Sequence, residues 1–264
     1  MRNSFVNNIK ILVALSGFVI TLASCSYKEI VDADYPDQKI YMPAAVNGNY
    51  IIAGVSPANK PFRYVVDMAA KKFNVPLSVY RSGINNNGGF TVDIKVDTDT
   101  ITRMIDASIL TGTLLLPADK YTIESAVDMA GGKEWAPFTL SVDLDFLRNN
   151  PGQLYALCVG VSSPQKEVNP ANCKTIIIID PKITLPVAGF TSTPVEDDPN
   201  TIQFTNTSAY ALEYSWDFGD GGKADVPSPA HTYTTAGTYT VKLTVTGITG
   251  EENKSTMDAT VTIP

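Results

Sequence analysis

Two stretches within the first 180 residues alternate strictly between apolar and polar side chains. In the stretch 92–96 the apolar residues are separated by Asp93 and Lys95. The stretch 138–146 repeats the pattern, with apolar residues at Phe138, Leu140, Val142, Leu144 and Phe146. Successive side chains of a β-strand point to opposite faces, so a period of two predicts strands with one buried face. The first part of the chain is therefore expected to form sheets that pack on a core.

Shorter runs rich in β-branched and aromatic residues predict further strands at 39–42, 62–67, 75–80, 121–123, 154–161 and 175–180. Glycine-containing turns separate them, notably at 85–89 and at Gly131-Gly132. Only 101–110 predicts a helix. The 264 residues allow two ordinary domains, and a proline-bounded segment from Pro181 to Pro186 predicts the linker between them. We expect an all-β protein made of two tandem antiparallel β-sandwiches.

The charge balance limits the classes of ligand. A formal net charge of −7 argues against nucleic-acid binding, which needs clustered lysines and arginines to neutralise phosphates. Gly131-Gly132 and Gly219-x-Gly221-Gly222 lack the lysine and the helix of a phosphate-binding loop. We expect neither a nucleic-acid partner nor a nucleotide cofactor.

The N-terminus has the features of an export signal. Arg2 and Lys10 precede an apolar run at 11–22, which is too short for a transmembrane helix, and small residues follow it. Leu22-Ala23-Ser24-Cys25 resembles the lipobox of bacterial lipoproteins. The resemblance implies a signal peptide at 1–24, lipid on Cys25 and a lipidated acidic tether at 25–34. The acidic tether resembles the surface-export tag of lipoproteins from glycan-harvesting gut bacteria, which implies an outer-membrane, cell-surface location. The alternatives are an ordinary signal peptide or a core helix.

Two cysteines remain beyond the expected anchor. Cys158 and Cys173 lie beside predicted strands, and an oxidising compartment permits a disulfide between them. Two buried free thiols fit the sequence equally well.

The order of the strands in the first region is similar to that of a known family. A strand at 92–97 is followed by Leu116-Pro117-Ala118-Asp119-Lys120-Tyr121, a Ser-Val-Asp-Leu-Asp strand, Tyr155-Ala156-Leu157 and an isoleucine strand. Residues 35–181 resemble the β-sandwich domain found at the N-terminus of many gut-bacterial surface lipoproteins encoded in glycan-utilisation loci. Some members precede family 18 glycoside hydrolase barrels. The segment 131–137 replaces a turn that is usually short in that family.

The second region carries a more specific motif. Trp216-Asp217-Phe218-Gly219-Asp220-Gly221 is followed by Pro229-Ala230-His231-Thr232-Tyr233 and then by Gly237-Thr238-Tyr239. Residues 186–264 resemble a PKD domain (the polycystic-kidney-disease module), which implies an immunoglobulin-like sandwich. Trp216 and Phe218 alternate with acidic residues, so both rings are expected to face the core.

Candidate catalytic and metal-binding groups are few. The single histidine, His231, lies in the PKD motif, where the resemblance implies a structural role. Asp143 and Asp145 would share one face of a strand, about 6.6–7 Å apart along the chain, but that face is expected to be solvated. The family 18 signature Asp-x-x-Asp-x-Asp-x-Glu does not occur, and no room for a hydrolase barrel follows the PKD region. We therefore expect no enzyme.

One histidine and two separated cysteines do not make a zinc site. The acidic loop at Glu196, Asp197 and Asp198 lacks the ordered set of six or more oxygens that calcium needs. We expect no metal and no cofactor.

Sugar binding needs only an exposed aromatic plane and a few polar groups. Trp135 is the first candidate, because it follows a glycine turn and lies beside Lys133 and Glu134. Tyr210 and Tyr214 in the PKD region, and Tyr64, are weaker candidates. The alternative is that Trp135 covers the end of the sandwich.

These features lead to two competing hypotheses. The first, partly implied by the family resemblance, is a non-catalytic surface lipoprotein that binds polysaccharide or oligosaccharide, or holds another protein of a glycan-utilisation system. The second is a structural spacer or adhesion module that engages a protein partner.

Overall fold

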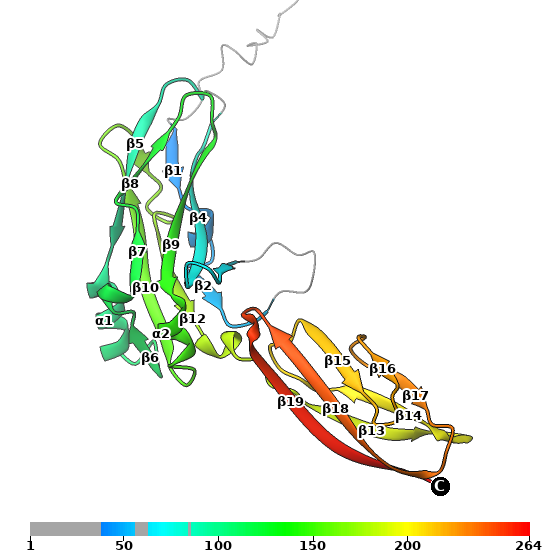
Figure 1. Cartoon of the computed structure of the whole chain (residues 1–264). Coiled ribbons are helices and arrows are strands. Elements are labelled where there is room, and N and C mark those ends of the chain that lie inside the picture. The colour runs from blue at the N-terminus through cyan, green and yellow to red at the C-terminus, as the bar shows by residue number, and fades with distance from the viewer. Residues whose placement is uncertain (1–37, 56–62, 84–85) are drawn as a thin grey trace, which may run out of the picture. The chain divides into compact units, whose positions relative to one another are not determined.

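The structure is a computed structural model that describes residues 38–55, 63–83 and 86–264. Nearly all of its regular elements are strands, and they form two β-sandwiches that follow one another along the chain (Figure 1). The expected all-β fold class is confirmed. The signal peptide, Cys25 and the tether lie outside the described residues. Among the helices that are described, none is long and apolar enough to cross a membrane.

The first sandwich has one sheet of mainly antiparallel strands. Its strands are β1 (Lys39–Tyr41), β3 (Val65–Asp67), β4 (Lys72–Arg81), β7 (Tyr121–Ile123), β9 (Trp135–Asp143) and β11 (Glu167–Val168). The order is β11-β1-β4-β9-β7, with β3 paired to β4. The central pair, β4 and β9, keeps one register from Lys72–Asp143 to Tyr80–Trp135. This register places residues far apart in the sequence side by side.

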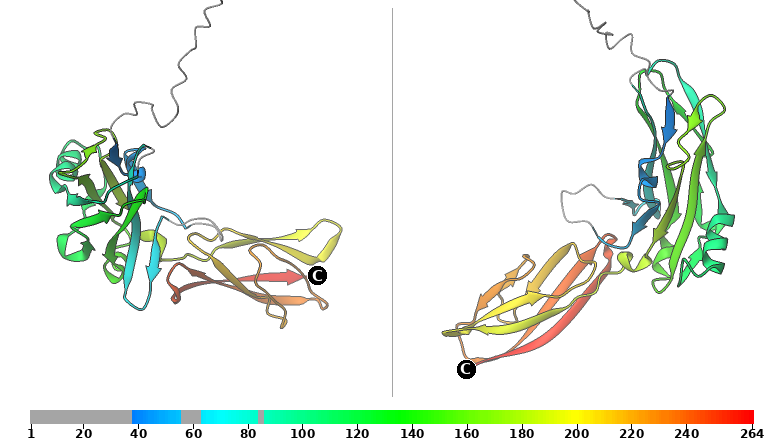
Figure 2. Two further views of the ribbon diagram at one scale, coloured as in Figure 1. Left: turned by 90° about the horizontal axis from the view of Figure 1, so that it is seen from above. Right: turned by 180° about the vertical axis from the view of Figure 1, so that it is seen from behind.

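The opposing sheet contains the remaining strands of this sandwich. They are β2 (Asn49–Ile52), β5 (Phe90–Val96), β6 (Thr113–Leu115), β8 (Ala126–Met129), β10 (Leu154–Ser162) and β12 (Lys174–Ile179), in the order β2-β12-β10-β5-β8, with β6 paired to β10. Among the described strands of this sandwich, three pairs are parallel: β1 with β11, β6 with β10 and β2 with β12. The domain is therefore a sandwich of mixed rather than purely antiparallel sheets. Figure 2 shows it from above and from behind.

The alternating stretches bury the face that their sequence predicts. Val92 and Ile94 of β5, and Phe138, Leu140 and Val142 of β9, all lie in the core of the first sandwich. The long strand β10 is buried on both faces, because helix α1 (Thr98–Asp106) covers its outer side through Ile101. The side chain of Asp97 caps α1 by accepting a hydrogen bond from the Thr100 backbone N–H.

The expectation that the strand at 138–146 runs to its last residue is wrong. Strand β9 ends at Asp143, and residues Leu144–Arg148 form helix α2. Asp143 ends the strand because its side chain accepts a hydrogen bond from the Phe146 backbone N–H at 3.0 Å and so caps the helix. Asp143 and Asp145 therefore do not share a strand face, and the carboxylate pair considered above is not formed.

The second sandwich is immunoglobulin-like and has two antiparallel sheets. One contains β13 (Phe190–Val195), β14 (Asp198–Asn206) and β17 (Ala230–Thr232). The other contains β15 (Glu213–Asp217), β16 (Lys223–Ala224), β18 (Gly237–Gly247) and β19 (Gly250–Ile263). Trp216 and Phe218 lie in the core of this sandwich, as their alternation predicts. Short 3-10 helices complete the described elements: η2 (Pro43–Ala45), η3 (Ala118–Lys120) and η4 (Pro181–Thr184), the last within the predicted linker.

The glycine-rich motif of the second sandwich has a steric basis at Gly219. Its φ angle is +84°, which favours glycine, and a Cβ atom there would lie 2.5 Å from the carbonyl oxygen of Thr240. No other residue fits this position without moving the backbone. The motif is thus explained by packing.

Candidate functional site

Three aromatic side chains form a row across the outer face of the first sandwich. Strand register pairs Tyr41 of β1 with Tyr80 of β4, and Tyr80 with Trp135 of β9. The ring centroids of Tyr41 and Tyr80 are 5.9 Å apart, and those of Tyr80 and Trp135 are 6.3 Å apart with planes inclined by only 18°. The neighbours Ile40, Val79 and Ala136 are buried, so the three rings lie on the opposite, outward face. We call these three residues the aromatic row.

The polar ends of the aromatic row have no partner within the part of the chain that the structure describes. The hydroxyls of Tyr41 and Tyr80 and the indole N–H of Trp135 make no hydrogen bond there. The aromatic residues of the second sandwich differ, since the indole of Trp216 donates to the Val226 carbonyl at 3.0 Å and the Tyr233 hydroxyl donates to the Phe218 carbonyl at 3.1 Å. Aromatic residues that serve packing usually satisfy their polar atoms internally. The aromatic row leaves these atoms available to a ligand.

A buried arginine holds the Trp135 end of the row in place. Arg81 follows Tyr80 on β4, points inward and is 4% exposed. Its guanidinium donates to the carbonyls of Lys133 (2.5 Å), Gly88 (3.0 Å) and Ala130 (2.8 Å), and its backbone N–H donates to the Glu134 carbonyl. These bonds join two turns to the sheet directly behind the row. The turn that precedes β9 lies at the end of the sandwich opposite to α1 and α2 (Figure 1).

The structure changes the expected setting of Trp135. We expected it in a loop opened by glycines, but it is the first residue of β9 and pairs with Tyr80. Its side chain is 49% exposed, so it does not simply close the core. Lys133 and Glu134 are exposed beside it, and the Asn86 amide approaches the Glu134 carboxylate at 3.5 Å. Trp135, Lys133 and Glu134, which the sequence predicted as one site, thus lie together.

The other predicted aromatic residues are less suited to bind a ligand. Tyr64 is buried and stacks on Phe73 with centroids 4.7 Å apart, and burial raises the pKa of its hydroxyl to about 12. Tyr210 and Tyr214 belong to the second sandwich, where both are half-buried. Tyr214 packs against the core and lines a cavity with Glu213 and Lys254.

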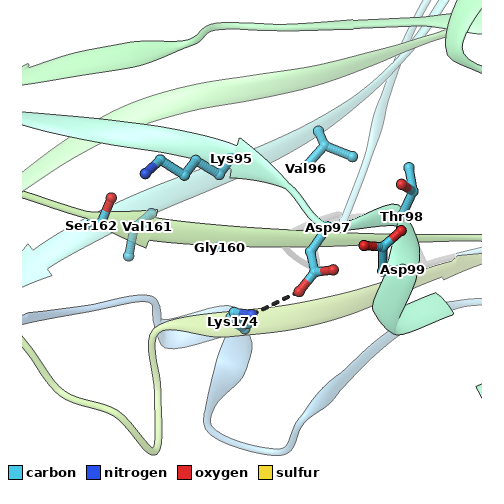
Figure 3. A pocket seen from close by; sticks show the side chains of 9 residues that line it. All are labelled: Lys95, Val96, Asp97, Thr98, Asp99, Gly160, Val161, Ser162 and Lys174. Carbon is cyan, nitrogen blue, oxygen red and sulfur yellow. Dashed lines mark hydrogen bonds and ion pairs between the residues drawn. The ribbon is translucent and has the colours of Figure 1, made fainter. Parts of the chain in front are cut away.

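A cavity lies on the other sheet of the first sandwich, beside the start of α1. It has a volume of about 350 Å³ and is lined by residues of β5, β10 and β12, among them Gly160 and Lys95. Across it, the Lys174 ammonium meets the Asp97 carboxylate at 2.7 Å (Figure 3). Hydrogen bonds from Lys174 and then Thr100 lower the pKa of Asp97 to about 2.

This cavity has a structural explanation. Gly160 lies between β5 and β12, opposite both Lys95 and Lys174. A Cβ atom at Gly160 would approach Cγ of Lys174 to 3.1 Å. The missing side chain therefore makes room for Lys174 to cross β10 and reach Asp97, which stabilises the cap of α1.

His231 is held inside the second sandwich. Its ring stacks on Phe218 with centroids 4.0 Å apart, and its Nε2 lies 2.8 Å from a carboxylate oxygen of Asp220. A Cβ atom on Gly222 would come within 2.5 Å of this ring. These contacts give His231 a packing role.

The two cysteines beyond the expected anchor are free thiols in the structure, so the disulfide that the sequence permits is not formed in it. Cys158 is buried under α1, and burial raises the pKa of its thiol to about 11. Cys173 is half-buried. At neutral pH the Cys158 thiol stays protonated and is a poor nucleophile.

The fold defines a protein built from two β-sandwich domains that follow one another along the chain. A family described as an N-terminal domain matches residues 35–168, which is more than half of the chain, and a second family, the PKD domain, matches residues 184–263. The chain belongs to this N-terminal-domain family and carries a PKD domain after it.

Individual known proteins resemble parts of the chain. Collagenase ColA of Bacillus cereus is 31% identical over 102 residues, which are 39% of this chain and 10% of the collagenase, so the match spans about a tenth of that relative. The crystallised PKD1 domain of the metalloprotease PrtV from Vibrio cholerae is 35% identical over 30% of this chain and 96% of that one, with a TM-score of 0.27. A candidate carbohydrate binding protein from Bacteroides ovatus covers 86% of this chain and 60% of its own, at 13% identity and a TM-score of 0.40.

Proposed function

We propose that this protein is a non-catalytic glycan-binding module and that the aromatic row of Tyr41, Tyr80 and Trp135 is its binding surface. The observation that carries the proposal is the exposed, register-paired row whose polar ends have no partner in the described chain. A pyranose ring presents C–H groups on its faces and hydroxyls at its rim. It can therefore stack on an aromatic plane while the hydroxyls bond to tyrosine and indole groups.

The rigidity of the row supports a binding role. The three residues come from neighbouring strands rather than from a loop, and Arg81 ties the preceding turns to the sheet. A surface that is already ordered loses little conformational entropy when it binds, which raises affinity.

The location belongs to the same proposal. The lipobox-like sequence ending at Cys25 supports export and attachment to the outer membrane by lipid. Two or three acyl chains, at about 0.8 kcal/mol per buried methylene, make such an anchor stable. In this arrangement the protein presents its binding surface outside the cell, next to other proteins that take up glycans.

The test is affinity electrophoresis of the purified protein in gels that contain soluble polysaccharides. We expect retardation on at least one of them and, for Trp135→Ala, at least a tenfold loss of affinity, because an aromatic residue that anchors a ligand typically contributes about 2 kcal/mol. Val226→Ala, at an exposed apolar position of the second sandwich, serves as the control and should bind like the parent. Retardation that Trp135→Ala leaves unchanged would move the site elsewhere.

The alternative function is a spacer that engages another protein. The internally satisfied aromatic residues of the second sandwich, Trp216 and Tyr233, favour a purely structural role for that domain. If no polysaccharide retards the protein, glycan binding is refuted and the spacer function becomes the proposal for the whole chain.

A further inference from the structure

We infer that the aromatic row takes an uncharged polysaccharide and contacts the interior of its chain rather than a chain end. This inference rests on the proposed function and adds the class of glycan. Three features of the row carry it: its length, its charge and its position on an open sheet face.

The length of the row exceeds that of one sugar. Its three rings lie on the adjacent strands β1, β4 and β9. Neighbouring strands are ~4.8 Å apart, so the row extends over about 10 Å. This distance matches two consecutive pyranose units, and the residues at the two ends of the row would contact different units. A single monosaccharide would use only part of the surface.

The charges around the row are balanced. At the Tyr41 end, the Lys39 ammonium forms an ion pair with Glu167 at 2.8 Å. At the other end, the exposed Lys133 and Glu134 carry opposite charges. The guanidinium of Arg81 is buried behind the sheet and bonded to backbone carbonyls. Neither end of the row carries an excess of positive charge, which a uronate or sulfate chain would need, and the net charge of −7 repels polyanions over longer distances.

Two small side chains lie next to the row. Ser78 of β4 pairs with Pro137 of β9. Both lie on the same face of the sheet as the row, two residues along their strands from Tyr80 and Trp135. Pro137 is exposed, and the Ser78 hydroxyl makes no hydrogen bond within the described chain. Trp135 is the first residue of β9, and β7 pairs with that strand only at residues 140–142. The sheet therefore ends at Trp135 on this side, and a chain can continue past it.

The experiment compares four sets of probes on the full protein. Gels with neutral xyloglucan, galactomannan or dextran are run against gels with polygalacturonate, alginate or heparin, at low and high NaCl. Isothermal titration then follows oligosaccharides of one to six units from the polysaccharide that binds best. The same oligosaccharides are also tested after borohydride reduction of their reducing ends.

We expect retardation by at least one neutral polymer, little change with salt, and at least a tenfold gain in affinity between the monosaccharide and the trisaccharide. Reduction of the chain end should leave the affinity for the hexasaccharide unchanged. Tyr41→Leu and Trp135→Ala, at opposite ends of the row, should each weaken trisaccharide binding about tenfold. Arg103→Ala, at an exposed position of α1 away from the row, is the matched control and should not.

Other outcomes separate the inference from the function on which it rests. Binding to polyanions alone, with strong salt dependence, overturns the inference and leaves glycan binding intact. The same holds if the monosaccharide binds as tightly as the trisaccharide, if end reduction abolishes binding, or if only one of the two row variants loses affinity. Absence of retardation on every polymer refutes the proposed function itself.

Discussion

Arg81→Met should disorder the Trp135 end of the aromatic row while the domain stays folded. The substitution keeps an unbranched apolar stem but removes the guanidinium that bonds to the carbonyls of Lys133, Gly88 and Ala130. The sheet and its core, including the inward neighbour Val79, keep their packing. The two turns lose their common anchor.

The magnitude follows from these three bonds. A hydrogen bond that involves a charged group contributes about 1.5–3 kcal/mol, so three additive bonds would give an upper limit of about 4.5–9 kcal/mol. The bonds share one side chain and are not additive, and the acceptors lie in exposed turns that water can reach once the arginine is gone. We therefore expect the free energy of unfolding of the first sandwich to fall by about 3 kcal/mol. At about 2–4 °C per kcal/mol, its thermal midpoint should drop by roughly 10 °C.

Differential scanning calorimetry measures this change in the thermal midpoint of the first sandwich. The transition of the PKD domain serves as an internal reference. Arg103→Met is the matched control, since Arg103 is exposed on α1 and its loss should cost under about 0.5 kcal/mol. At a temperature where Arg81→Met is folded, its glycan affinity should still fall, and Arg81→Lys should restore only part of it because an ammonium cannot reach three carbonyls. A midpoint for Arg81→Met equal to that of the parent would refute this account of the clamp.

Two further predictions concern positions away from the row. Gly219→Ala should destabilise the PKD domain more than Gly221→Ala. Both glycines have a positive φ, which alone costs an alanine about 1–2 kcal/mol, but only at Gly219 would the Cβ lie 2.5 Å from a backbone oxygen, that of Thr240. Urea denaturation measures the two losses, and equal losses would show that the clash is absent. Asp97, whose pKa is lowered to about 2, stabilises the folded state fully above its ordinary pKa near 3.8, and this contribution is lost as the pH falls toward 2. Because Lys174 is largely exposed, the loss should be about 1 kcal/mol, and Asp97→Asn should remove that part of the acid dependence; an unchanged acid profile would contradict the assignment.

Much of the fold was predictable because it depends on local patterns. The period of two at Val92–Val96 and in the first part of β9 was enough to place strands and their buried faces. The PKD motif was equally informative, because Gly219 and Trp216 meet steric requirements that few sequences satisfy. Prediction failed at Leu144, where the alternation continues but the side chain of Asp143 caps a helix. Asp143 occupies a polar position of the alternating stretch whether it continues the strand or caps a helix. The alternation therefore does not distinguish a longer strand from a strand that ends in a helix.

The binding surface shows where local patterns stop being informative. The sequence singled out Trp135 through its glycine turn, together with Lys133 and Glu134. It did not single out Tyr41 or Tyr80, which read as ordinary aromatic residues of short strands. Their importance comes from strand register, which sets them beside each other and beside Trp135.

The sequence alone determined that this chain forms β-sandwiches, that one of them is a PKD domain, and that Trp135 is a candidate contact. The tertiary structure decided that Trp135 is one end of a row and that Arg81 holds it from behind. The physical reason is the distance along the chain: Tyr41, Tyr80 and Trp135 are brought together by hydrogen bonds between strands that are far apart in the sequence. Such pairing depends on all strands of the sheet at once, and no local period records it.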